Sequence, residues 1–457
     1  MPRCFDYAKI MRMLRALTWL AALPALLGRE PLAISTFSVD ATPPLGAALE
    51  MGMCKPALEI VDRLSVRGIV LRNAGAPIVL VAVDWVGIAN GGQREWRSAL
   101  ADAAGTTPDR VAVHTLHQHD APGFDPTAER LLEPFGLSGQ LCDVKAGREA
   151  IQRAADALRQ SLSDSRRVTQ IGLGRGKVEQ VASNRRILGA DGKVQFGRMS
   201  SCKDPKVRAE PEGLIDPWVR LLSFWDGDRP LAVISYYATH PQSFYCQGGV
   251  SADFVGMARA LREQELPGVF HIHFNGAGGN VAAGKYNDGS PAMRPILARR
   301  LADGMASAWK STVRSPLDSA AVDWRVLRLT LPVSAALRDT DRLRAVLADE
   351  KAERRTRGKA ATDLAWAANP DATLARLRLG PATVLLMPGE LFVEYQLAAQ
   401  QMKPGRFVAM AAYGEYGPGY IGTAAAYSQG GYETGPVSRV SPEVEAVLTN
   451  AMRELMK

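Results

Sequence analysis

All six histidines of the chain lie in three short segments. Residues 114–124 (HTLHQHDAPGF) hold three of them, residues 236–244 (YYATHPQSF) hold one, and residues 269–280 (VFHIHFNGAGGN) hold two. Each segment lies at or near the end of an apolar run. Scattered surface histidines would not cluster in this way. Because neutral imidazole is a preferred zinc ligand, the pattern raises a metal site as a hypothesis.

The first segment carries the strongest signal. His117 and His119 are two residues apart, and on an extended segment this spacing puts both imidazoles on one side, where they can share a site. Asp120 could orient a metal ligand by a hydrogen bond without binding the metal itself. His240 can join such a site only through a tertiary contact. For the pair in residues 269–280 we favour buried, hydrogen-bonded side chains, with lining of the same cleft as the alternative.

Glu390 is a candidate carboxylate ligand. It follows a short apolar run and a Pro-Gly turn, and it opens a helical pattern, ELFVEYQLAAQQM. A carboxylate at a helix N-terminus is also stabilised by the helix dipole, so a capping role is an equal alternative. Two histidines, one carboxylate and an open position would make a catalytic zinc arrangement.

The elements that must position these residues alternate between strands and helices, which predicts an α/β fold with sheets flanked by helices. Strand-like runs that end in polar or glycine-rich turns occupy residues 76–83, 110–113, 218–225, 230–237, 268–274 and 383–387. Helical periodicity occurs in residues 143–162, 253–264, 292–309, 339–353 and 442–456. Ligand-binding groups gather at strand ends in such folds. We therefore predict an active site at the strand ends. Asp84, Ala282 and the loop residues Asn275 and Gly278 are the predicted substrate contacts, and a tight turn that packs strand against helix is an equal alternative for the loop.

Residues 1–30 resemble a secretory signal peptide. Their net charge is positive, and they contain a 13-residue apolar stretch from Ala16 to Gly28, which is too short to span a bilayer. A buried N-terminal helix is the alternative. We expect a secreted or periplasmic protein whose residues 31–457 form a single domain. Four of the five cysteines lie outside the leader, which fits either two disulfides or independent buried thiols.

The composition excludes several classes of protein. Hydrophobic residues make up 47% of the 457 residues and charged residues 22%, as in ordinary globular proteins. The 55 Lys and Arg against 47 Asp and Glu give a net charge of +8 without any dense basic run. We therefore expect no nucleic-acid partner.

Four segments together resemble neutral ceramidases. HQHDAPGF is similar to their H-T-H-S-G-P-G segment, YYATHPQS to F-A-T-H-x-x-S, and MPGELF to P-G-E-F. Residues 420–435 are similar to the segment Y-x-T-T…Q-x-Y-E-x-x-S, which supplies two tyrosines. The four segments follow the family's order across most of the chain.

The resemblance implies a zinc-dependent amidase of the neutral-ceramidase catalytic-domain fold, with mixed sheets. By this resemblance zinc is held by His117, His240, Glu390 and Tyr420. The catalytic positions correspond to His119 beside the metal, Tyr432 as an oxyanion donor, and Arg185 in the site. The substrate is expected to be a small or lipid-like acyl compound, with peripheral membrane contact.

The chain also departs from the family. Ala282 stands where the family has a substrate-contacting serine, the family's C-terminal immunoglobulin-like domain has no counterpart, and DAPG carries an acid where the family has serine. A serine nucleophile at residue 282 is therefore excluded, and a zinc-activated water is the expected nucleophile. Alternatives are hydrolysis of a lactone, an N-acyl amino sugar or a glycoconjugate, or a catalytically silent protein that binds a lipid or glycan.

Overall fold

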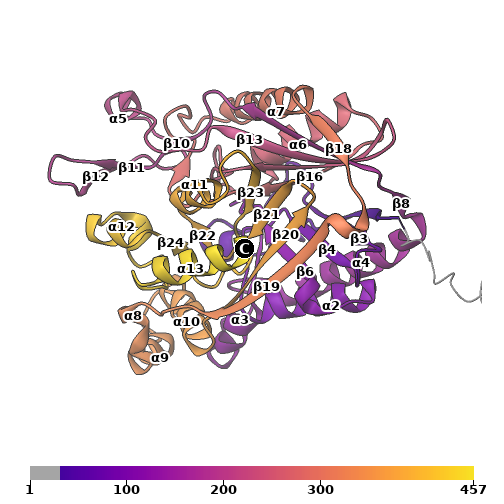
Figure 1. Cartoon of the computed structure of the whole chain (residues 1–457). Helices are drawn as coiled ribbons and strands as arrows, with labels where there is room; N and C mark the ends of the chain where they lie inside the picture. Colours follow the sequence, from indigo (N-terminus) through magenta and orange to yellow (C-terminus); the bar gives the residue numbers. More distant parts are fainter. Residues whose placement is uncertain (1–30) are drawn as a thin grey trace, which may run out of the picture.

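A computed structural model describes residues 31–457, and the segment interpreted as a signal peptide lies outside them. The first of three large sheets has the strand order β6-β4-β3-β1-β8 (Figure 1). Its strands are β1 (Ala33–Asp40), β3 (Ser65–Arg72), β4 (Ile78–Val83), β6 (Val111–Thr115) and β8 (Arg166–Arg167). All neighbours are antiparallel except β4 and β6, which run parallel at one edge.

The second and third sheets repeat this design. The second has the order β16-β14-β13-β9-β18, and its parallel pair is β14–β16. The third has the order β19-β20-β21-β23, and its parallel pair is β21–β23. The strand bounds are β9 (Gln170–Lys177), β13 (Trp218–Asp226), β14 (Arg229–Tyr237), β16 (Phe270–Asn275), β18 (Val313–Pro316), β19 (Val322–Thr330), β20 (Asp371–Leu379), β21 (Ala382–Leu386) and β23 (Phe407–Ala411).

The three parallel edges meet in the middle of the molecule. β16 packs against β4, β6 and β23, and β14 also contacts β23. Backbone bonds join the ends of these strands: the Thr115 N–H donates to the Tyr413 carbonyl, and the Ala412 N–H donates to the Asn275 carbonyl. The carboxyl ends of the parallel strands are therefore gathered in one place.

Helices cover the outer faces of the sheets. In Figure 1, α2 (Gly91–Ala104) and α4 (Val144–Ser161) lie below the first sheet, and α6 (Asp253–Glu265) and α7 (Met293–Lys310) lie above the second. In α4 the buried residues recur every three or four positions, so one apolar face packs on the sheet. Its N-terminus is capped by Asp143, whose carboxylate accepts the Ala146 N–H at 2.9 Å.

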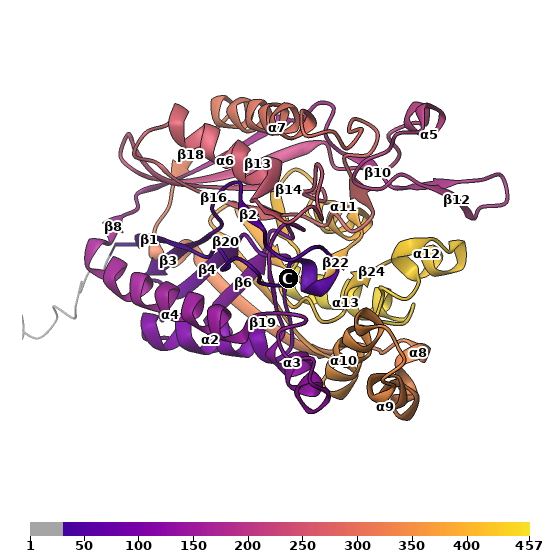
Figure 2. The same ribbon diagram turned by 180° about the vertical axis from the view of Figure 1, so that it is seen from behind.

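Other helices surround the third sheet (Figure 2). α13 (Val444–Met456) contacts β19 and β20, and α11 (Val393–Gln401) contacts β23. The remaining α-helices are α3 (Pro126–Leu132), α5 (Pro205–Ala209), α8 (Ala335–Arg338), α9 (Thr340–Ala348), α10 (Arg354–Ala368) and α12 (Ala424–Gln429). No helix within residues 31–457 is long and apolar enough to cross a membrane.

Very short strand pairs tie loops together between the sheets. β22 (Glu390–Leu391) runs parallel to β24 (Tyr420–Ile421), and β10 (Ser183–Asn184) is antiparallel to β17 (Val281–Ala282). β2 (Glu59–Ile60) runs parallel to β15 (Gly249–Val250), and β5 (Gly87–Ile88) runs parallel to β7 (Gly123–Phe124). A hairpin of β11 (Arg186–Leu188) and β12 (Val194–Gly197) projects from the body (Figure 2).

The predicted mixed α/β class is confirmed. Two local predictions are wrong. The helix expected over residues 339–353 ends at Ala348, and α10 starts at Arg354. Glu390 lies in β22 rather than at a helix N-terminus, because α11 begins only at Val393.

The four cysteines of the described chain do not form two disulfides. Cys54 and Cys246 are bonded, whereas Cys142 and Cys202 are free. Cys142 is buried in the core under α4, and Cys202 is half-buried in the segment that leads to α5. The alternative of independent thiols therefore holds for this second pair.

Candidate metal centre

The strand ends bring three predicted ligands together. His117 lies two residues beyond β6, His240 lies three residues beyond β14, and Glu390 lies in β22, just beyond β21. The Nε2 atoms of His117 and His240 are 3.2 and 3.1 Å from Oε2 of Glu390. The three ligand atoms all lie within 4.8 Å of one another, and each residue is 1% exposed. We call these three residues the metal cluster.

Backbone carbonyls orient both imidazoles. His117 Nδ1 lies 2.8 Å from the Val86 carbonyl, and His240 Nδ1 lies 2.8 Å from the Gly278 carbonyl. A carbonyl only accepts, so Nδ1 of each ring carries the proton. Nε2 is then free to act as a ligand, and a hydrogen bond from the other ring nitrogen is the usual support of a metal-binding histidine.

The charge states of the cluster fit a bound cation. Burial and the nearby Arg185 together lower the pKa of His240 to about 4, so its imidazole is neutral near pH 7. Burial alone would raise the pKa of Glu390, but His117 and His240 hold it well below its usual value. His240 Nε2 and Glu390 Oε2 are then two acceptors 3.1 Å apart with no proton between them. A cation bound at this point would be coordinated by both atoms, and the repulsion between their lone pairs would be removed.

Tyr420 and Arg185 close the inner side of the cluster. Tyr420 is the register partner of Glu390 in the β22–β24 pair, and its hydroxyl lies 3.0 Å from His240 Nε2. Arg185 Nη1 donates to the same hydroxyl at 3.0 Å. Burial raises the pKa of Tyr420 well above its usual value, although Arg185 opposes the shift. The phenol therefore needs a nearby cation to ionise.

His119 and Tyr432 lie on the more open side. His119 Nε2 is 3.2 Å from His117 Nε2, and the side chain of His119 is 13% exposed. The Tyr432 ring meets the Tyr420 ring edge-on at 5.7 Å and is 50% exposed. Exposure thus rises from the metal cluster to these two residues, which marks the direction from which a substrate would enter.

The structure assigns the other predicted contacts to scaffold roles. Asp84 is fully buried, where it pairs with Arg259 at 2.7 Å and accepts a bond from the Ser65 hydroxyl. Its carboxylate is therefore already engaged by Arg259 and Ser65, and the substrate contact of Asp84 stays a prediction. Asn275 is 1% exposed and donates to the Leu116 carbonyl. Gly278 supports His240 through its carbonyl.

Ala282 is also placed inside the protein. It is fully buried in β17, and its carbonyl accepts the Ser183 hydroxyl at 3.0 Å. Ala282 is thus as buried as the metal cluster itself, and its contact with a substrate stays a prediction.

The histidines outside the cluster are internal. His114 Nδ1 lies 2.7 Å from the Ala412 carbonyl, and His273 Nδ1 lies 2.8 Å from the Ser235 hydroxyl. Burial lowers the pKa of His273 to about 3 and that of His271, beside Arg262, also to about 3. Both are neutral packing residues. Asp120 does not support a histidine ring; its carboxylate accepts the Cys246 N–H at 2.9 Å.

Several residues around the cluster were not predicted from the sequence. Tyr413 stacks on His117 at 4.9 Å, and Tyr245 meets His119 edge-on at 4.8 Å. Glu433, with 3% of its side chain exposed, pairs with Arg185 at 3.2 Å. Glu50 Oε1 lies 2.9 Å from His119 Nδ1. Only Glu433 had a sequence signal, because it belongs to the segment that carries Tyr432.

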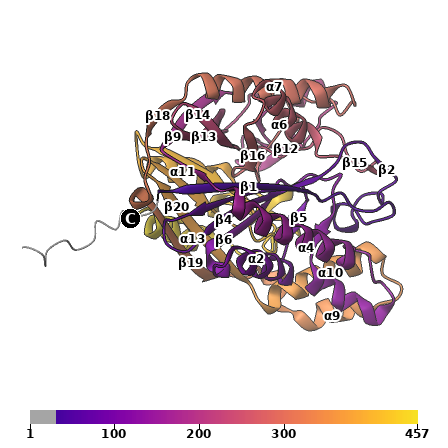
Figure 3. The same ribbon diagram turned by 90° about the vertical axis from the view of Figure 1, so that its right-hand side faces the viewer.

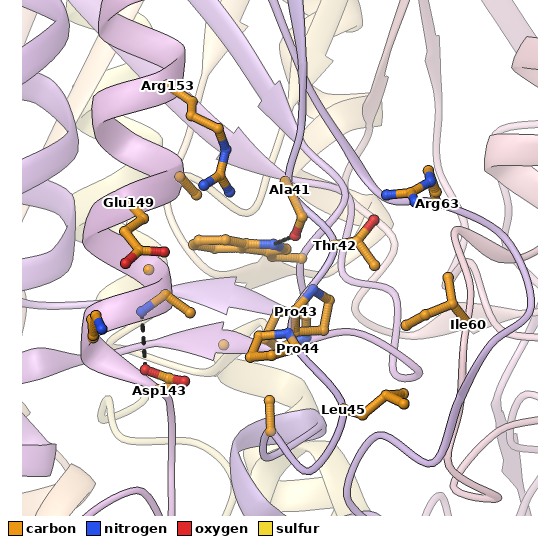
Figure 4. A pocket seen from close by; sticks show the side chains of 18 residues that line it. Ala41, Thr42, Pro43, Pro44, Leu45, Ile60, Arg63, Asp143, Glu149 and Arg153 are labelled. Atoms are coloured by element: carbon orange, nitrogen blue, oxygen red, sulfur yellow. Dashed lines mark hydrogen bonds between the residues drawn. The ribbon is translucent and has the colours of Figure 1, made fainter.

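The cavity in Figure 4 lies away from these residues. It has a volume of about 520 Å³ and lies between residues 41–45 and α4, with Trp85 in its wall. Arg63, Glu149 and Arg153 lie around it in Figure 4. No residue of the metal cluster lines this cavity.

Comparisons with known proteins place the fold. No protein-family model matches the chain, and no curated protein matches it. The crystal structure of neutral ceramidase from Pseudomonas aeruginosa superposes with a TM-score of 0.66 at 17% identity, over 93% of this chain and 74% of that chain. A ceramidase complexed with C2 gives a TM-score of 0.65 at the same identity and coverage. The chain therefore shares the ceramidase fold.

Proposed function

We propose that this chain is a zinc-dependent hydrolase that cleaves the amide bond of a lipid-like or N-acylated substrate. The observation that carries the proposal is the convergence of His117 Nε2, His240 Nε2 and a Glu390 oxygen at three strand ends. The ceramidase fold supports the class of reaction.

His117, His240, Glu390 and Tyr420 would hold the metal. A bound zinc ion polarises a carbonyl and brings the pKa of a water molecule to about 7. Both histidines turn Nδ1 to a carbonyl, so Nε2 is the nitrogen that would hold the metal. His240 is neutral near pH 7, whereas, despite burial, Glu390 raises the pKa of His117, so metal binding would displace a proton from His117 Nε2. Arg185, donating to the Tyr420 hydroxyl, would stabilise the phenolate that coordination requires.

The residues on the open side supply the remaining steps. Burial and the Glu390 carboxylate together raise the pKa of Tyr432 to about 12, so the phenol keeps its proton at neutral pH. Tyr432 can then donate to the oxyanion that forms when the amide carbonyl is attacked. His119 would move a proton from the nucleophile to the leaving nitrogen through Nε2. Residue 282 is alanine and supplies no nucleophile, so the proposal takes a metal-activated water as the nucleophile.

We further propose that the protein is secreted or periplasmic. The apolar stretch in residues 16–28 supports this, and so does the Cys54–Cys246 disulfide, because disulfides persist in oxidising compartments. Peripheral membrane contact is supported by exposed apolar side chains in the segment that carries Glu50: Leu45, Met53, Leu58, Ile60 and Val61.

The test combines metal analysis with a substrate panel. The purified full chain should contain one zinc, lose activity to a chelator and regain it with added zinc. An N-acyl sphingoid base and an N-acyl amino acid should be hydrolysed faster than a matched ester, a lactone or an N-acyl amino sugar. His240→Ala serves as the inactive control. Zinc-free protein, or turnover of the lactone alone, would contradict the proposal.

A further inference from the structure

The wall beside His119 is made by two loops that are distant in the sequence. One carries Glu50, and the other carries Tyr245. The Cys54–Cys246 disulfide joins the two loops across a sequence separation of 192 residues. The β2–β15 pair continues the contact a few residues further on, where the two strands lie side by side in Figure 3.

The Glu50 carboxylate contacts the His119 ring at one polar atom. Oε1 of Glu50 lies 2.9 Å from His119 Nδ1, and the other oxygen, Oε2, lies against the disulfide sulfurs, 3.3 Å from Cys246 Sγ. Within the part of the chain that the structure describes, His119 offers the only nitrogen close to this carboxylate. The two atoms lie at ion-pair distance without an aligned hydrogen bond, so the contact is electrostatic. A carboxylate cannot donate, so its negative charge favours a proton on His119 Nδ1, which leaves Nε2 as an acceptor.

Both loops are also fixed to the chain just after His119. The Glu50 N–H donates to the Ala121 carbonyl at 2.9 Å, and the Cys246 N–H donates to the Asp120 carboxylate at 2.9 Å. Glu50 and Cys246 each adopt left-handed backbone, with φ values of 45° and 65°. Non-glycine residues persist in this region only where their surroundings hold them.

We propose that Glu50 is the positioning residue of His119, and that the Cys54–Cys246 disulfide holds Glu50 in place. Glu50 fixes the Nδ1–H tautomer and the ring orientation, so that the Nε2 lone pair faces the metal cluster. The effect on turnover rests on the proposed hydrolase function. The effect on the tautomer does not, because it concerns only the contact between two side chains.

The tautomer is measured directly by NMR. Long-range ¹H–¹⁵N correlation spectra of the full chain labelled with ¹⁵N-histidine distinguish Nδ1–H from Nε2–H rings, and His119→Gln identifies the signal. We expect the Nδ1–H form of His119 in the unsubstituted protein. In Glu50→Gln, whose amide can donate to Nδ1, this form should be lost. The control Glu95→Gln, which removes a half-buried carboxylate of α2 that pairs with Arg148, should leave it unchanged. An Nε2–H ring in the unsubstituted protein would overturn the proposal.

Kinetic measurements distinguish a positioning role of Glu50 from a role in folding. Glu50→Gln should lower kcat by about 10²-fold, the lower bound for a general acid–base group. KM and zinc content should stay within about three-fold. Unchanged kcat together with an unchanged tautomer would overturn the role of Glu50. If the substrate panel gives no turnover, the proposed function fails, and the NMR result alone decides the positioning role.

The disulfide is tested by reduction and by substitution. Cys54→Ser/Cys246→Ser should lower kcat in the same direction as Glu50→Gln and disturb the same His119 signal. The control Cys202→Ser, which removes a free thiol, should behave like the unsubstituted chain. If the double variant does not fold, mild reduction of the folded protein replaces it. A fully reduced, folded protein with an unchanged His119 signal would overturn the role of the disulfide.

Discussion

The metal cluster and the rim beside it are held in different ways. His117, His240 and Glu390 follow strands of three sheets and are almost completely buried, and Nδ1 of each histidine faces a backbone carbonyl. The rim, formed by Glu50, His119, Tyr245 and Tyr432, lies on loops, is partly exposed and depends on a disulfide and on left-handed backbone.

This difference separates two tasks. A metal site needs several ligand atoms at fixed separations. The register of the sheets fixes these separations because the strands that carry the ligands are rigid. A proton-transfer site must also admit substrate, so it cannot be buried on all sides. The rim residues are partly exposed, and a disulfide and local hydrogen bonds hold them in position instead. Substitutions in the cluster should therefore affect metal content, and those in the rim should affect turnover.

The largest expected effect comes from the cluster. His117→Ala and His240→Ala should each lose most of the zinc and essentially all activity, because three ligands cannot hold the ion as tightly as four. Metal analysis of the purified variants, beside activity, measures both. Stoichiometric zinc in both variants would remove these histidines from the ligand set.

The next effect separates the two tyrosines. Tyr420→Phe should lose metal and activity together. Tyr432→Phe should keep its zinc, keep KM within a few-fold and lose about 10²–10³ in kcat, as expected for an oxyanion donor. Zinc content, kcat and KM are measured for both variants. Normal turnover of Tyr432→Phe would leave this residue a packing role only.

A smaller effect is expected at the boundary of the cluster. Ala282→Ser places a hydroxyl in a fully buried position, which costs about 1–3 kcal/mol when the group finds no partner. We expect a lower Tm and no large gain in turnover, although the preference among substrates can shift. Thermal unfolding and assay of the substrate panel measure these outcomes. A trapped acyl-serine with a rate gain of orders of magnitude would show that the scaffold accepts a serine nucleophile.

The smallest effect concerns Glu415, a half-buried carboxylate that contrasts with the buried Glu390. Glu390 faces histidines, whereas Glu415 Oε1 accepts only the backbone N–H groups of Asn90 and Gly417, both at 2.9 Å. Burial raises the pKa of Glu415 to about 8, so folding favours its protonated form. This stability is complete below the usual value of about 4.5 and is lost as pH rises through about 8.

Glu415→Gln should therefore raise Tm by roughly 2 °C at pH 9 and change it little at pH 4.5. Gln keeps an oxygen that can accept both N–H groups and does not ionise. Melting curves at the two pH values test the sign. A gain at low pH alone would contradict the raised pKa of Glu415.

The sequence allowed the fold class and the grouping of His117, His240 and Glu390 to be predicted, but not the way in which the site is built. Clustered histidines at strand ends reflect the sheet, which local periodicity encodes. The role of Asp84 was missed because its partner Arg259 lies 175 residues away in sequence. Glu50 was missed because no periodic pattern marks a loop, and its contact with His119 depends on a disulfide whose pairing the sequence left open. Glu390 was expected to start a helix because two-residue strands leave no periodic signal.

The parallel pairing of β22 with β24 has a consequence for length variation. Glu390 and Tyr420 are register partners, and everything between them is a crossover through α11 and β23. An extra residue in the exposed turn at residues 403–406 changes only the length of that crossover, and we expect it to leave zinc content unchanged. An extra residue between Met387 and Glu390 would displace the carboxylate relative to the phenol. Homologous chains with this site should therefore vary in length at the first place and keep it constant at the second.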